Sequence, residues 1–140
     1  MNLETRTTTN AAPERVWAVL SDLDAWPEWL PTVDSLEREE SGRPHEVGAA
    51  YMVKQPRLPR ARWVITDWRV GEGFVWESET PGARTTGTHD LAPTADGGTE
   101  IVLGVEWNGP LAGLARLMFG RLTQRYIDAE SAALAERATG

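Results

Sequence analysis

The sequence predicts an α+β fold in which an antiparallel sheet of short strands packs against one long C-terminal helix. Turn signals recur about every ten residues between positions 33 and 107, a spacing typical of consecutive β-hairpins. After Pro110 the chain contains no further proline, and its apolar residues follow helical spacing. Two short segments with helical signals precede the strands, so two short helices are expected near the N-terminus.

The composition limits the functions open to this chain. Its 140 residues suit one domain spanning positions 1–140. The net charge of −7 disfavours nucleic acid as a partner, because phosphates repel an acidic protein. The absence of cysteine excludes disulfides, thiolate metal sites and thiol catalysis. With no signal peptide and no apolar run long enough to span a bilayer, we expect a cytoplasmic monomer or homodimer without integral membrane association.

The N-terminal segment predicts one strand followed by two short helices. The threonine-rich residues 3–9 favour an edge strand. A helix is expected over 13–22, because proline suits the first helical position and apolar residues follow at helical spacing. Asp24 is expected to cap the second helix, with Pro27 in its first turn. Together these elements predict the order strand, helix, helix before the hairpins begin.

The alternation of side chains predicts which face of each strand is buried. Strands are expected at residues 48–55, 61–70, 73–79, 84–92 and 99–107. The inward residues are predicted to be Tyr51, Val53, Phe74, Trp76, Ser78, Gly87, His89, Leu91, Ile101, Leu103, Val105 and Trp107. The strand 61–70 is ambiguous. Trp63 and Ile65 suit one of its faces, whereas Val64 and Trp68 suit the other.

The C-terminal helix is expected to run from Pro110 to about Arg137. At 100° per residue its apolar stripe consists of Leu111, Leu114, Ala115, Met118, Leu122, Tyr126, Ala129 and Ala133. Its first half, residues 111–119, is apolar almost all round. This half is too short to span a membrane, and it lacks the basic flank that would favour a membrane surface. We therefore expect it to pack on the sheet, with one face toward the interior.

Several motifs resemble the START-like (helix-grip, SRPBCC) superfamily, and within it the polyketide cyclase/dehydrase and lipid-transport group. The resemblance is carried by Ala12-Pro13, Val16-Trp17, Leu20, Asp22, Trp26-Pro27-Glu28-Trp29, Phe74-Val75-Trp76-Glu77, His89-Asp90-Leu91 and Gly109-Pro110-Leu111. It covers nearly the whole chain. It implies a curved sheet of about seven strands that grips the long helix, with two short helices after the first strand and a cavity between sheet and helix. Members of the group bind lipids, sterols, polyketides or plant hormones, and some catalyse cyclisation and dehydration.

Simple geometry also favours a cavity, because a concave sheet cannot lie flush along a straight helix. Either side chains or a ligand must fill the gap. We therefore predict that the protein binds a hydrophobic small molecule, such as a lipid or polyketide, without metal or cofactor, in a cavity of at least about 300 Å³. The predicted ligand-binding residues are Tyr51, Trp63, Trp76, His89, Trp107, Met118 and Tyr126. Whether the indoles line the cavity or fill it stays open.

Two other functions remain possible from the sequence. One is an enzyme of the polyketide cyclase/dehydratase type that uses the same cavity. Its candidate polar groups are Tyr51, Asp67, His89 and Arg125, although no motif selects them, and His89 could equally be a satisfied polar group or a hydrogen-bonding partner for a ligand. The other is a protein-interaction module with a filled cavity, in which Val64 and Trp68 form an exposed apolar patch.

Two further features each have two interpretations. The residues Lys54, Arg57, Arg60 and Arg62 place four positive charges within nine positions. They could steer an anionic ligand such as a carboxylate to the cavity, or form a solvated loop that offsets nearby acids. Trp26 and Trp29 could guard the mouth of the cavity or attach the short helices to the sheet.

Overall fold

Seven strands form one antiparallel sheet in the computed structural model, which describes residues 2–139. The sheet order is β1-β7-β6-β5-β4-β3-β2. The strands are β1 (Asn2–Thr9), β2 (Ser35–Arg38), β3 (Ala50–Lys54), β4 (Ala61–Arg69), β5 (Gly73–Thr80), β6 (Ala83–Pro93) and β7 (Thr99–Asn108). The helices are α1 (Pro13–Leu20), the 3₁₀ turn η1 (Leu23–Ala25), α2 (Trp26–Trp29) and α3 (Ala112–Thr139). The predicted α+β class and antiparallel sheet are confirmed.

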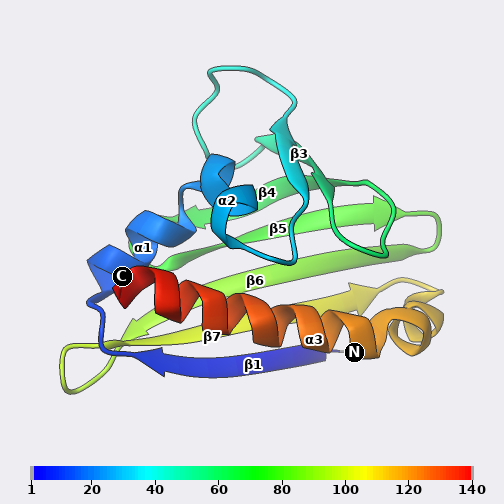
Figure 1. Ribbon diagram of the computed structural model, residues 1–140. Coiled ribbons are helices and arrows are strands. Elements are labelled where there is room, and N and C mark those ends of the chain that lie inside the picture. Colours follow the sequence, from blue (N-terminus) through cyan, green and yellow to red (C-terminus); the bar gives the residue numbers. More distant parts are fainter. Residues whose placement is uncertain (1, 140) are drawn as a thin grey trace.

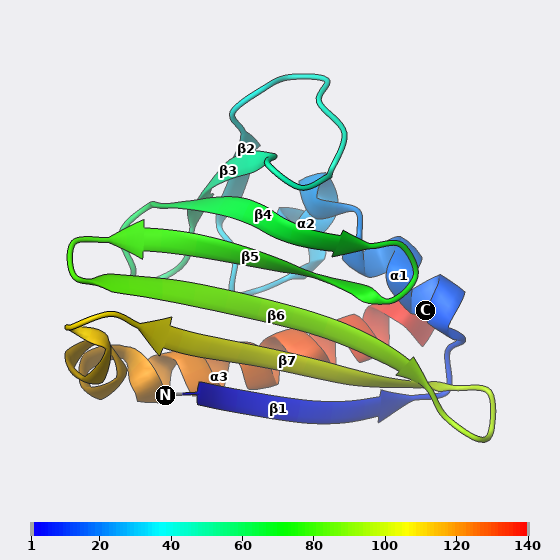
Figure 2. The same cartoon turned by 180° about the vertical axis from the view of Figure 1, so that it is seen from behind.

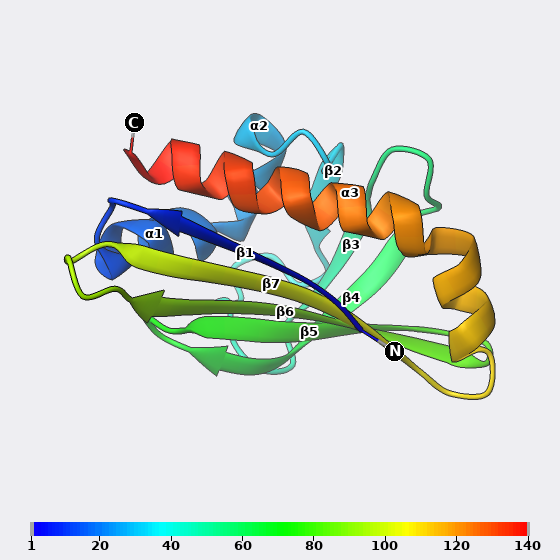
Figure 3. The ribbon, with the colours of Figure 1, turned by 90° about the horizontal axis from the view of Figure 1, so that it is seen from below.

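The helices cover one face of the sheet (Figure 1). Helix α3 runs along β1 and β7, and its C-terminal end lies beside α1. Seen from behind, the opposite face of the sheet carries no helix (Figure 2). Seen from below, the sheet curves beneath α3, and the first turns of α3 bend away from the axis of the rest (Figure 3). This is the helix-grip arrangement that the resemblance implied. No described helix is long and apolar enough to cross a membrane.

The two short helices form as predicted, with a different start for the second. Helix α1 begins at Pro13 and ends two residues before the expected boundary at 22. The second segment begins as the 3₁₀ turn η1, and no side chain caps it. Asp24 does not act as the cap, because its carboxylate accepts hydrogen bonds from Arg38, with Nε–Oδ1 at 2.9 Å. The pKa of Asp24 is lowered mainly by that guanidinium hydrogen bond, so a charge-assisted pair replaces the predicted cap.

A β-bulge in β4 resolves the ambiguity of that strand. The register with β5 pairs Ile65 with Trp76, shifts, and then pairs Trp68 with Phe74. Directly paired residues share a face, so Ile65 and Trp68 both point inward. Trp68 packs edge-on against Trp17 of α1, with ring centroids 5.1 Å apart. The predicted outward patch containing Trp68 is therefore wrong, because a bulge shifts the two-residue alternation by one position.

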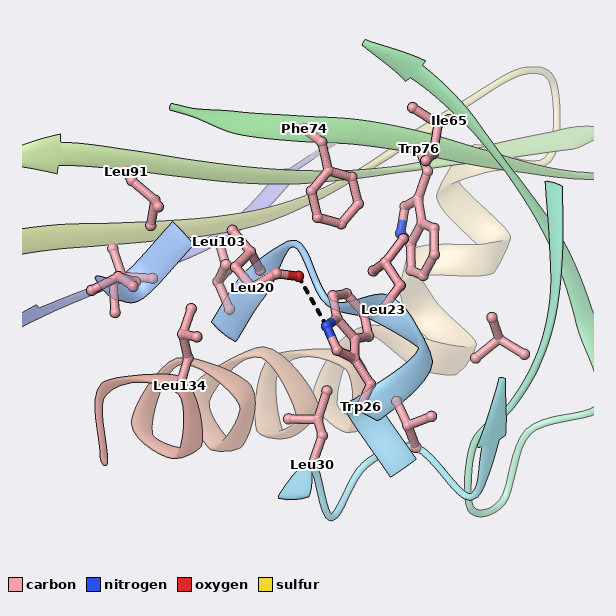
Figure 4. Close-up of a cluster of buried hydrophobic side chains, with 14 of the residues drawn as sticks. Leu20, Leu23, Trp26, Leu30, Ile65, Phe74, Trp76, Leu91, Leu103 and Leu134 are labelled. Carbon is pink, nitrogen blue, oxygen red and sulfur yellow. Dashed lines mark hydrogen bonds between the residues drawn. The ribbon is translucent and has the colours of Figure 1, made fainter. Parts of the chain in front are cut away.

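The core joins the inner face of the sheet to the short helices and the C-terminal half of α3 (Figure 4). The predicted inward residues of the other strands are buried, except Val105, which is half-buried. The indole Nε1 of Trp26 donates to the carbonyl of Leu20 at 3.0 Å. This bond satisfies the polar end of a buried indole and fixes α2 against α1.

Helix α3 does not bury the stripe predicted for it. Its fully buried residues are Ile127, Ser131, Leu134 and Ala138. The expected packing of residues 111–119 on the sheet is wrong for the four apolar residues Leu111, Leu114, Leu117 and Met118, which are exposed. Helical periodicity marks the most apolar face, but it does not reveal that the first turns of α3 bend away from the axis of the rest (Figure 3), where these side chains are exposed.

Candidate functional site

A cavity of about 250 Å³ lies between the inner face of the sheet and α3. Its wall includes the indoles of Trp26, Trp63, Trp76 and Trp107, with side chains from the β3–β4 loop and from α3. The volume is below the expected minimum of about 300 Å³, so that expectation is wrong, and the size counts against a large ligand. The indoles therefore both line the space and narrow it, which favours a guest smaller than a typical drug-sized ligand.

The floor of the cavity depends on a glycine in β6. A Cβ at Gly87 would lie 3.0 Å from Nε1 and Cδ1 of Trp76 and 3.7 Å from Trp63. The missing side chain lets the two rings lie close to the sheet, with centroids 5.2 Å apart. Trp26 approaches Trp76 edge-on at 5.4 Å. Trp26 therefore attaches α2 to the sheet, as one interpretation expected, and also lines the cavity, whereas Trp29 does not line it.

His89 supplies a neutral acceptor to the cavity wall. Its ring stacks on Phe74, with centroids 4.1 Å apart, and its Nδ1 lies 3.2 Å from the Phe74 carbonyl. A carbonyl only accepts, so Nδ1 carries the proton and Nε2 keeps its lone pair. Burial lowers the pKa of His89 to about 4, so the ring is neutral at pH 7. Every completely buried side-chain nitrogen or oxygen among the described residues has a hydrogen-bond partner. Because Nε2 has none, it is not completely buried, and the space that His89 borders is the cavity.

Glu130 of α3 is the polar residue that the sequence analysis missed. It lines the cavity, and its Oε2 accepts a hydrogen bond of 2.7 Å from the buried hydroxyl of Thr32. Burial raises the pKa of Glu130 to about 7. Helical spacing could have revealed it, because Glu130 lies four residues after Tyr126 and four before Leu134. A search for apolar stripes passes over an acid in such a position.

The remaining polar groups of the cavity wall are uncharged. They include the hydroxyls of Ser78, Thr85, Thr88 and Thr123. The phenol of Tyr126 donates to the carbonyl of Pro56, which ties the β3–β4 loop to α3. No lysine or arginine of the described chain lines the cavity. The wall therefore offers acceptors and hydroxyls but no cation to pair with an anion.

The structure brings five of the seven predicted site residues together. Trp63, Trp76, His89, Trp107 and Tyr126 all line the cavity. Tyr51 and Met118 are not among its lining residues. The expectation that Met118 points inward is wrong, since its side chain is 64% exposed on the bent first turns of α3.

Tyr51 lies behind the cavity wall in a separate polar network. Its ring centroid is 6.1 Å from that of Trp76. Arg38 donates to Nε2 of His45 at 3.2 Å, so Nδ1 of His45 carries the proton and donates to the Tyr51 oxygen at 2.6 Å. Burial raises the pKa of Tyr51 to about 12. The phenol is thus neutral at pH 7 and engaged away from the cavity.

Of the four candidate catalytic groups, His89 is in the wall of the cavity and the others are not. Asp67 accepts a bond of 2.8 Å from Arg69, and Arg125 is exposed. The structure therefore does not bring Asp67 and Arg125 to this cavity.

The four basic side chains of Lys54, Arg57, Arg60 and Arg62 do not line the cavity, although other residues of the same loop do. Arg62 pairs with Glu39 at 2.6 Å, and Arg60 lies 3.9 Å from Glu37. This arrangement favours a solvated loop that offsets nearby acids over a guide for anionic ligands. Among residues 2–139, no three His, Asp or Glu side chains gather where they could hold a metal ion.

Comparisons with known proteins agree with this architecture. The family model for polyketide cyclase/dehydrase and lipid transport matches residues 1–139, whereas no curated protein sequence matches the chain. The aromatase/cyclase Zhui from Streptomyces sp. R1128 has a similar structure, with a TM-score of 0.80, 19% identity and coverage of 99% of this chain and 93% of that one.

Two other solved structures show the same fold. A START superfamily protein from Mycobacterium smegmatis gives a TM-score of 0.70 at 16% identity, covering 99% of this chain and 97% of that one. Norcoclaurine synthase from Thalictrum, a point mutant in complex with a transition-state analogue, gives 0.77 at 14% identity, covering 99% and 94%. The chain belongs to the polyketide cyclase/dehydrase and lipid transport family.

Proposed function

We propose that the protein binds a small, uncharged hydrophobic molecule that carries a hydrogen-bond donor, in the cavity between the sheet and α3. The observation that carries this proposal is the combination of an indole-lined wall with two acceptors, Nε2 of His89 and the carboxyl of Glu130. Apolar surface buried against the indoles would supply affinity at about 25 cal/mol per Å². A phenolic hydroxyl facing either acceptor would fix the orientation.

The lining also predicts which guests are rejected. A carboxylate entering this space would lose its hydration and meet Glu130 without a compensating cation. Anionic lipids and free fatty acids are therefore poor candidates. Small bicyclic or tricyclic phenols match both the size and the polarity of the cavity.

We expect 2-naphthol to bind and 2-naphthoate to bind at least about tenfold more weakly, since the anion pays the cost of desolvation. Isothermal titration calorimetry measures both. Ala61 lines the cavity from β4, so Ala61→Phe should block 2-naphthol by filling the space. Ala92→Phe is the matched control, because Ala92 is an exposed residue of β6 outside the cavity.

Before the titrations, circular dichroism should be used to check that both variants are folded. Binding of 2-naphthol that survives Ala61→Phe unchanged would contradict the proposed location. Equal affinity for 2-naphthol and 2-naphthoate would contradict the proposed chemistry of the wall.

A second candidate is dehydration of a β-hydroxy ketone, and Glu130 is the observation that favours it. With its pKa raised to about 7, this carboxylate can remove a proton from the carbon beside the ketone and pass it to the departing hydroxyl, which leaves as water. His89 would accept a hydrogen bond from a substrate hydroxyl. Both groups line the cavity.

If this second function holds, Glu130→Gln should lower the turnover of a β-hydroxy ketone substrate by at least about a hundredfold. Glu136→Gln, an exposed carboxylate on the same helix, should leave turnover unchanged. Release of the dehydrated product, followed by its absorbance, is the measurement. Equal turnover by both variants would remove Glu130 from the reaction.

A further inference from the structure

The turn before α3 and the first turns of α3 expose a cluster of large apolar side chains. Leu111, Leu114, Leu117 and Met118 are 47%, 51%, 82% and 64% exposed. They lie within eight consecutive positions of the sequence. The other large exposed apolar residues of the described chain are Val47 in the β2–β3 loop and Val70 in the β4–β5 turn. Such a cluster is a typical sign of an interaction surface.

Three arginines lie within or shortly after this cluster in the sequence, and the next acid along the chain is Asp128. Between Glu106 and Asp128 the sequence contains Arg116, Arg121 and Arg125 but no Asp or Glu. All three are exposed, and none forms an ion pair or hydrogen bond with the described residues.

The arginines of the sheet behave differently. Arg62 pairs with Glu39, Arg69 with Asp67 and Asp90, and Arg84 with Glu77 and Glu79. In a chain with a net charge of −7, the first half of α3 is thus a local region of uncompensated positive charge.

The apolar and basic residues share one face of the helix. At 100° per residue, Leu114, Leu117 and Met118 lie on the same side as Arg121 and Arg125. The opposite side carries Phe119, Thr123 and Tyr126, which line the cavity. The outward side, formed by Leu111, Leu114, Leu117, Met118, Arg121 and Arg125 and here called the α3 outer face, is therefore separate from the ligand site.

We propose that the α3 outer face docks the protein peripherally on an anionic lipid membrane. The apolar side chains would enter the boundary between head groups and acyl chains, while the arginines contact anionic head groups. This revises the expectation that the segment lacks a basic flank, because Arg121 and Arg125 provide one in the folded helix. The inference does not depend on the identity of the cavity ligand.

A second copy of the chain fits this surface less well. A symmetric dimer places the same patch against itself. Arg121 and Arg125 of one copy would then meet those of the other, with no acid between Glu106 and Asp128 to offset them. An anionic membrane compensates the same charges, so charge complementarity favours it.

Sedimentation with vesicles tests the proposal. Vesicles of phosphatidylcholine with one quarter phosphatidylglycerol should bind the protein, and pure phosphatidylcholine should bind it at least about tenfold more weakly. The pair R121Q/R125Q should weaken binding by roughly thirtyfold, at about fivefold for each arginine. The pair L117Q/M118Q should weaken it by at least tenfold. The matched control V47Q/V70Q, which alters exposed apolar residues elsewhere, should bind as the unmodified protein does.

Three results would overturn the proposal. The first is equal binding to both kinds of vesicle, and the second is an equal loss in V47Q/V70Q. The third is failure to bind either vesicle. If the protein binds neither vesicle and light scattering shows a dimer that L117Q/M118Q dissociates, the surface is a contact between copies. If the protein binds neither vesicle and is monomeric, the partner of the surface is not a membrane. Titration with 2-naphthol, expected to be unchanged in all these variants, separates this outcome from failure of the cavity proposal.

Discussion

Replacing Trp76 by alanine is expected to lower the free energy of unfolding by about 3–5 kcal/mol, as for other large aromatic side chains removed from a core. Trp76 is buried at the centre of the aromatic cluster. Its ring contacts those of Trp63 at 5.2 Å, Trp26 at 5.4 Å and Phe74 at 5.6 Å. Collapse cannot easily fill the space, because the existing cavity already borders the indole.

Trp29→Ala provides the comparison for this variant. Trp29 is half-buried and lines a surface groove formed with α1 and α3. Its loss should cost less than half as much as the loss of Trp76. Urea unfolding followed by circular dichroism measures both variants. If the two lose the same stability, the aromatic cluster beneath α2 is not the centre of the core.

The strands and their buried faces could be predicted because local chemistry determines them. In β5, Glu77 and Glu79 alternate with Trp76 and Ser78, so a single register buries the apolar set. The fold family was readable for the same reason, since its motifs are local. The bulge beside Thr66 was not readable, because a bulge depends on how two strands pair.

The candidate site was predictable in composition but not in shape. The indoles and His89 follow from strand alternation, whereas the cavity volume depends on how closely Trp63 and Trp76 approach Gly87. Glu130 was missed because a polar residue on an inner face is recognised only after the helix is docked. The prediction for Met118 was wrong for the converse reason, since this apolar side chain is exposed on the bent first turns of α3.

Glu130→Gln is expected to raise the free energy of unfolding at pH 8 by on the order of 2 kcal/mol. The pKa of Glu130 is raised from 4.5 to about 7 in the folded protein, so the folded state holds this proton more tightly than the unfolded state. The contribution to stability is complete below pH 4.5 and disappears as the pH rises through 7. Glutamine cannot ionise, and its side-chain oxygen can still accept the hydrogen bond from Thr32. Below pH 4.5 the variant and the unmodified protein should therefore be equally stable.

His89 produces the opposite dependence, which makes the comparison sharper. Its pKa is lowered from 6.5 to about 4 by burial, so its contribution is present above pH 6.5 and is lost as the pH falls through 4. Between pH 4 and 7 the effects of the two groups on the free energy of unfolding oppose each other in the unmodified protein. In Glu130→Gln the free energy of unfolding should rise with pH because of His89, and in His89→Gln it should fall with pH because of Glu130.

Urea unfolding at intervals of half a pH unit from pH 4 to 8 measures how the free energy of unfolding of each variant depends on pH. Glu136→Gln makes the same change in formal charge at an exposed position of α3, and its profile should run parallel to that of the unmodified protein. If the Glu130→Gln profile is parallel as well, the Glu130 carboxyl is hydrated in the folded protein. Water would then occupy the cavity beside α3. An uncharged aromatic ligand would not bind there, because its binding would have to desolvate an ionised carboxylate.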